Sequence, residues 1–89
     1  MTAPQTTDEI DAAVLEYLAA HDTGPAPERD DDLFRTGRVN SLFAIQLMGF
    51  LESTFAIELD VDDLDLKHFA SIAAITEFVR RKQRAAEHA

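Results

Sequence analysis

Ser41 is the residue whose type and position best suit chemistry in this sequence. It stands between Asn40 and Leu42, where an irregular segment changes to a helical pattern. A helix that begins at or just before Ser41 leaves backbone N–H groups without intrahelical partners, and its dipole places partial positive charge there. A phosphate ester on the Ser41 hydroxyl would therefore be stabilised. Alternatively, Asn40 or Ser41 only caps the helix, an interaction worth about 1 kcal/mol relative to alanine.

Other residues with catalytic or metal-binding potential lack the patterns that such sites need. A hydrolase or isomerase that pairs Ser41 with His21 or His68 has no supporting motif, since Gly-x-Ser-x-Gly and an evident oxyanion loop are missing. For His68 a surface or packing role is favoured. The acidic run 30–32 does not follow a calcium-loop pattern, so no metal site is predicted.

The wider stretch around the serine resembles the attachment region of acyl and peptidyl carrier proteins. The resemblance rests on Asp32-Leu33-Phe34, Gly37, Asn40-Ser41-Leu42, a helix ending at Phe55 and Ile57 beyond it, and it extends from about Ile10 to Val79. In that family the serine of an Asp-Ser-Leu motif receives a 4'-phosphopantetheine arm. Two features depart from the usual pattern: Asn40 replaces the aspartate, and one extra residue separates the glycine from the serine.

This resemblance implies a non-catalytic carrier with 4'-phosphopantetheine bound covalently to Ser41. The arm would hold acyl or aminoacyl groups as thioesters, while the chemistry would belong to the cofactor and to separate enzymes. The expected partners are a phosphopantetheinyl transferase, an acyl-loading enzyme and downstream synthase or tailoring enzymes. Asn40 and Leu42 would flank the attachment point.

The cargo class also follows from resemblance. The run GRVNSLFAIQL resembles stand-alone carriers of glyceryl-derived or methoxymalonyl-type extender units in polyketide and related secondary-metabolite biosynthesis. D-alanyl-type and peptidyl carriers are the alternatives. A further alternative is a carrier-like helical interaction domain that is never modified, which the replacement of aspartate by Asn40 favours.

The helix that follows Ser41 is expected to present a docking surface. Its apolar residues recur at roughly helical spacing as far as Phe55. With Leu42, Ile45 and Leu51 turned inward, the outer face would carry four residues. These are Phe43, Gln46, Gly49 and Glu52, which predict a partner contact more apolar than electrostatic. Alternatively, Phe43 folds back and belongs to the core.

Two elements precede the serine helix in the predicted fold. Thr6 or Thr7 caps a first helix that ends near Ala20 or His21, and its apolar stripe comprises Ile10, Val14, Tyr17 and Leu18. A long loop follows because His21 to Asp32 is rich in proline and acid. Leu33 and Phe34 tether this loop to the core, and Gly37 permits a turn with positive φ.

The remainder of the chain completes an all-α prediction. An alternating strand-like pattern after Ala56 has no partner strand, so we expect an extended connection and a short helix around Asp62 to Leu66, with Leu64 and Leu66 turned inward. Ser71 caps a last helix with Ile72, Ile75, Phe78 and Val79 on one face. The expected fold is an acyl-carrier-like four-helix bundle, three longer helices and one short, with a long first loop. Its parts are a disordered N-terminus (1–6), the domain (7–82) and a frayed tail (83–89).

Composition narrows the classes of function. A chain of 89 residues forms one small domain that buries about 60 to 65% of its unfolded surface, which disfavours a deep active site. The net charge of -9 and the pI near 4.5 argue against binding to nucleic acid or an anionic membrane. There are no cysteines, and no signal peptide or membrane span is evident. We therefore expect a cytoplasmic monomer.

Overall fold

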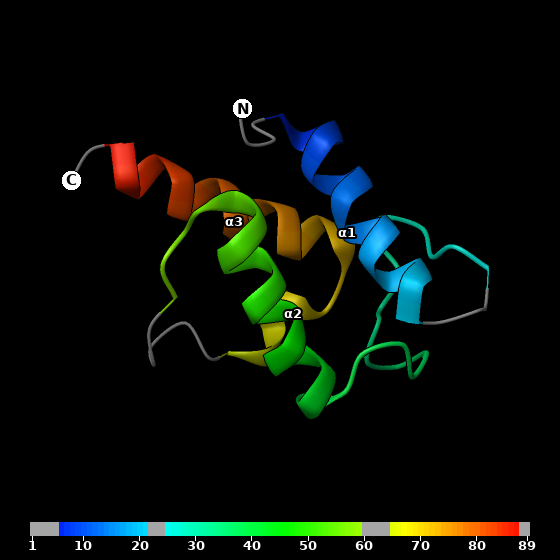
Figure 1. Cartoon of the computed structure of the whole chain (residues 1–89). Helices are drawn as coiled ribbons and strands as arrows, with labels where there is room; N and C mark the ends of the chain where they lie inside the picture. The colour runs from blue at the N-terminus through cyan, green and yellow to red at the C-terminus, as the bar shows by residue number, and fades with distance from the viewer. Residues whose placement is uncertain (1–5, 22–24, 60–64, 88–89) are drawn as a thin grey trace.

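The described part of the chain is all-helical, as predicted. The computed structural model describes residues 6–21, 25–59 and 65–87, among which no strand occurs. The elements are three α-helices, α1 (Thr7–His21), α2 (Ser41–Phe55) and α3 (Ile72–Glu87), and a 3-10 helix, η2 (Leu66–Phe69), between α2 and α3. Figure 1 shows α3 passing behind α2, with α1 to one side. The predicted short helix at 62–66 lies mostly outside the described residues, so the four-helix count stays a prediction.

Local hydrogen bonds explain where α1 and α3 begin. The backbone N–H of Glu9 donates to Thr6 Oγ1 at 3.1 Å, and the Thr6 hydroxyl donates to the Glu9 carboxylate at 2.9 Å. At α3 the N–H of Ala74 donates to Ser71 Oγ at 3.1 Å. Both predicted caps are thus confirmed, and each satisfies an N–H group that the helix itself leaves unpaired. At its other end α3 stays helical to Glu87, through most of the segment that the sequence assigned to a frayed tail.

The hydrophobic core centres on α3, which packs against α1, α2 and η2. Each helix contributes an apolar stripe at helical spacing. The fully or nearly fully buried members are Ile10, Val14 and Leu18 of α1, Ala44, Leu47, Leu51 and Phe55 of α2, Phe69 of η2, and Ile72, Ile75, Phe78 and Val79 of α3. His68 has the packing role predicted for it, because its ring stacks on Phe78 at a centroid distance of 4.7 Å.

The connection between α1 and α2 is anchored where the sequence indicated. Leu33 is fully buried, and its N–H donates to the carbonyl of Ala70 at 2.7 Å. The Asp32 carboxylate accepts two backbone N–H bonds at 3.1 Å, so it builds a turn in front of this anchor. Gly37 has φ of 80°, the positive value predicted for the turn before the serine helix.

The predicted inward face of α2 was wrong at two positions. Leu42 and Ile45 are 67% and 60% exposed, whereas Leu51 is buried as expected. The reason is visible in the spacing: a stripe through Leu42 and Ile45 continues to Gly49 and Glu52, which offer no apolar surface.

The stripe that is buried instead keeps apolar residues along the whole helix, and its members are Ala44, Leu47, Leu51 and Phe55. Leu66, also predicted inward, is 47% exposed at the start of η2. Leu64 lies outside the described residues.

Candidate functional site

At the start of α2, Asn40 rather than Ser41 caps the helix. Asn40 has an extended backbone, and its side-chain oxygen accepts the N–H of Phe43 at 2.9 Å. Asn40 is therefore the N-cap. Ser41 is the first residue of α2, and it is exposed. Because Asn40 accepts the N–H of Phe43, the cap does not need the Ser41 hydroxyl.

The electrostatics at this end of α2 suit a phosphate group. The first turn contains no acidic residue, and the first acid of the helix is Glu52. Arg38 lies three residues before Ser41. A negative group at the first turn of a helix gains about 0.3–1 kcal/mol from the helix dipole. The neutral Asn40 keeps the cap without placing a like charge beside such a group.

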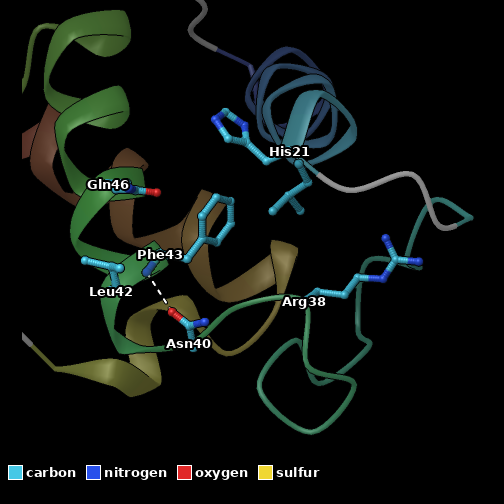
Figure 2. A pocket seen from close by; sticks show the side chains of 7 residues that line it. His21, Arg38, Asn40, Leu42, Phe43 and Gln46 are labelled. Atoms are coloured by element: carbon cyan, nitrogen blue, oxygen red, sulfur yellow. Dashed lines mark hydrogen bonds between the residues drawn. The ribbon is translucent and has the colours of Figure 1, made fainter.

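A cavity of about 310 Å³ lies next to Ser41, between α1 and α2. Its lining includes the two residues that flank Ser41 and comprises Leu18, His21, Arg38, Asn40, Leu42, Phe43 and Gln46. Figure 2 shows Phe43 and Gln46 reaching from α2 toward His21 on α1, with Arg38 on the loop that leads to Asn40. We call this cavity the serine groove.

Aromatic rings bridge the space between α1 and α2. Among the described residues, no Cα atom of α1 lies within 8 Å of one in α2. The ring of Tyr17 spans this distance, with its centroid 5.7 Å from that of Phe43 and 4.3 Å from that of Phe50. The ring of His21 is tilted against that of Tyr17, with the two centroids 4.4 Å apart. Side chains rather than close backbone approach therefore join α1 to α2.

The four predicted docking residues lie in two environments. Gln46, Gly49 and Glu52 are exposed, as expected, and Glu52 also accepts the N–H of Leu59 at 3.2 Å. Phe43 is half-buried and packs against the core. The alternative that Phe43 folds back onto neighbouring residues is thus the one that its position supports.

Sequence reasoning placed Leu42 at the site but expected Leu42 and Ile45 to face inward, and it missed Arg38. The apolar pair is followed along its own stripe by Gly49 and Glu52, a signal that would have placed it outside. Arg38 carried no comparable signal, because its contribution to the serine groove depends on the path of the loop. Its guanidinium donates to the carbonyl of Pro25.

Comparison with known families decides the class of protein. A family model described as the phosphopantetheine attachment site matches residues 10–79. The chain belongs to this family. Its members carry 4'-phosphopantetheine covalently on a serine and act with a modifying transferase and partner enzymes. Searches of curated proteins and of solved structures gave no significant match.

The residues at the start of α2 fit the group that this phosphopantetheine-binding family carries. An exposed hydroxyl stands at the first helical position, the first turn lacks acids, and a groove opens beside it.

No helix in the described part of the chain is long and apolar enough to span a bilayer. The same residues contain no group of three or more His, Cys, Asp or Glu side chains suited to hold a metal ion.

Proposed function

We propose that Ser41 carries the 4'-phosphopantetheine arm and that the chain presents tethered acyl groups to partner enzymes. The observation that carries this proposal is the contrast among the three serines of the chain. Ser53 is exposed but lies near the C-terminal, negative end of α2. Ser71 accepts the N–H of Ala74 as the cap of α3 and is half-buried. Ser41 alone of the three combines exposure with a positive helix end.

The modification step uses coenzyme A as the donor. The Ser41 oxygen attacks the phosphorus next to the pantetheine portion, forming the new O–P bond. The P–O bond of the pyrophosphate breaks, 3',5'-ADP leaves, and the serine proton passes to a base of the transferase. The thiol of the attached arm then holds the acyl group as a thioester. Ser41 contributes the nucleophile, and α2 contributes its position.

Partner enzymes are proposed to dock on the exposed side of α2 around Gln46, Gly49 and Glu52. To these the structure adds Leu42 and Ile45, exposed apolar residues one and four positions after Ser41. No charged residue occurs in α2 before Glu52. Docking through this face therefore depends on apolar contact more than on ion pairing, and we expect it to weaken little with added salt.

The run GRVNSLFAIQL supports a role in polyketide or related secondary-metabolite biosynthesis, with glyceryl-derived or methoxymalonyl-type extender units as cargo. D-alanyl-type and peptidyl carriers are the alternatives. They differ in the enzyme that loads them: an aminoacyl cargo needs an adenylating enzyme, whereas an acyl extender unit needs an acyl-loading enzyme. Loading assays with the two enzyme classes distinguish them.

Intact mass spectrometry tests the attachment. The unmodified protein is incubated with coenzyme A and a broad-specificity phosphopantetheinyl transferase. We expect a gain of one phosphopantetheinyl group in the wild type and in Ser53→Ala, and none in Ser41→Ala. Circular dichroism should show that Ser41→Ala remains folded, because Asn40 supplies the cap. If the folded wild type gains no mass with several transferases, the unmodified interaction domain becomes the better account.

A further inference from the structure

The exposed residues of α2 form one face that begins at Ser41. They recur at spacings of three and four residues, as one side of a helix requires. They are Ser41, Leu42, Ile45, Gln46, Gly49, Glu52 and Ser53. Glu52 is the single charged member. Leu42 and Ile45 are 67% and 60% exposed, so this face presents apolar surface beside the serine.

Gly49 stands near the middle of this face, although internal packing does not require a glycine there. Its backbone is helical, whereas the positive φ among the described glycines belongs to Gly37. A Cβ atom added to Gly49 would meet no heavy atom of the described chain within 4 Å, apart from its chain neighbours and the backbone of its own helix. Glycine inside a helix is less favourable than alanine. Gly49 therefore weakens α2 without improving the packing of the fold.

The missing side chain opens a notch on the exposed face. Residues at i, i+3, i+4 and i+7 of a helix surround a hole that can receive a side chain from a facing helix. Leu42, Ile45, Gln46 and Gly49 have this spacing. Because Gly49 contributes no side chain, the hole is open at that corner, and another backbone can approach α2 closely. We call this hole the Gly49 notch. Two of its members are apolar and none is charged, so it suits a large apolar side chain.

The enzyme that modifies Ser41 is the partner whose surface must extend over this notch. Gly49 lies eight residues after Ser41, which is about 12 Å along the helix axis at a rise of about 1.5 Å per residue. A specific protein interface covers about 800 Å² on each partner, an area that reaches about 16 Å from its centre. A transferase centred on Ser41 would therefore cover Gly49. The uncharged stretch from Ser41 to Leu51 matches an apolar rather than an ionic surface opposite it.

We propose that the Gly49 notch receives an apolar side chain of the phosphopantetheinyl transferase and that the size of residue 49 determines how well this enzyme recognises the chain. This inference rests on the proposed attachment at Ser41. It assigns Gly49 to recognition rather than to the transfer step, since the residue lies two turns from the hydroxyl. A side chain at position 49 should weaken transferase binding while it strengthens the helix.

Transfer kinetics with substitutions of graded size test this inference. Wild type, Gly49→Ala and Gly49→Leu are compared as acceptors, with coenzyme A and a broad-specificity phosphopantetheinyl transferase as the probe. We expect the KM for the carrier to rise about threefold for Gly49→Ala and about tenfold for Gly49→Leu, with kcat within about twofold of wild type. The Tm of Gly49→Ala should rise by about 4–8 °C. Weaker transfer to this variant is then not a consequence of unfolding.

A matched control and a second measurement locate the effect. Ala12 is exposed on α1, so Ala12→Leu adds bulk away from the notch and should keep the wild-type KM. With coenzyme A omitted, adding the transferase should shift or broaden the amide signals of Leu42, Ile45 and Gly49 in the wild type. The same amount of transferase should affect Gly49→Leu less.

The outcomes separate this inference from the attachment itself. A folded wild type that gains no mass rejects attachment at Ser41. A modified wild type with an unchanged KM in both Gly49 variants leaves the attachment intact and overturns the notch as a transferase contact. Equal losses for Gly49→Ala and Gly49→Leu, or a fall in kcat at unchanged KM, also overturn it, because they would indicate that α2 needs flexibility rather than space at residue 49.

Discussion

The α1–α3 and α1–α2 interfaces are built in different ways. Between α1 and α3, aliphatic side chains such as Val14 and Ile75 are fully buried, and the hydroxyl of Thr76 on α3 donates to Asp11 on α1. Between α1 and α2, aromatic rings cross a wider space that has a cavity on either side of the ring stack. The first interface therefore serves as the scaffold, and the second leaves a cavity beside the residues that flank Ser41.

Asp11 shows how the scaffold extends to the loop. Its carboxylate accepts from Thr76 and forms an ion pair with Arg29 Nε at 2.6 Å. The hydrogen bond from Arg29 to Asp11 raises the pKa of Arg29 above its ordinary value. The Asp11 side chain thus links α1 to α3 and to the loop before α2, whereas the ring contacts of Tyr17 with Phe43 and Phe50 link only α1 and α2.

The largest expected effect tests this division directly. Ile75→Ala removes a fully buried side chain from the scaffold and should lower the free energy of unfolding by about 2–5 kcal/mol. Tyr17→Leu keeps an apolar side chain between α1 and α2 but loses the ring pairs, each worth about 0.5–1.5 kcal/mol, so its loss should be smaller. Urea unfolding measures both. An equal or larger loss for Tyr17→Leu would show that the α1–α2 interface is also scaffold.

Features that depend on residues close together in the chain could be predicted from the sequence, whereas features that depend on tertiary packing could not. Caps and turns follow from short-range hydrogen bonding, so Thr6, Ser71 and Gly37 were placed correctly. The start of a helix at Ser41 was predicted because the residues that indicate it are contiguous in the chain. The face of α2 was misassigned at Leu42 and Ile45 because nearly every residue there is apolar, and only packing against α3 and η2 selects one stripe.

The serine groove could not be predicted from the sequence, because it too depends on tertiary packing. It forms from His21 and Leu18 on α1 and from Phe43 and Gln46 on α2, residues more than 20 positions apart. Their approach depends on how both helices pack on other elements, which no periodicity within either helix specifies. Tyr17 was expected on the apolar stripe of α1, but its ring contacts with Phe43 and Phe50 became visible only in three dimensions.

A smaller effect is expected from the polar link within the scaffold. Thr76→Val retains the shape of a residue that is 1% exposed but removes the hydroxyl that donates to Asp11. Hydrogen bonds to charged groups contribute about 1.5–3 kcal/mol, and the added apolar methyl offsets part of that, so we expect a loss of about 1–2 kcal/mol. Thr54→Val on α2 is the matched control and should change stability by less than ~0.5 kcal/mol. Equal losses in both variants would mean that the α1–α3 link adds nothing specific.

The smallest and most informative effect concerns Asn40. Asn40→Ala should cost about 1 kcal/mol, because the N–H of Phe43 loses its acceptor. Asn40→Asp keeps the acceptor and adds a negative charge beside the positive end of α2, which should stabilise the unmodified protein by about 0.3–1 kcal/mol. After the arm is attached to Ser41, its phosphate brings a second negative charge to the same turn, and like charges this close repel. The benefit of Asn40→Asp should therefore shrink or reverse in the modified protein, while the cost of Asn40→Ala stays unchanged. Urea unfolding of both variants, with and without the arm, measures this coupling. An unchanged benefit of Asn40→Asp would show that the phosphate does not share the N-terminal turn of α2.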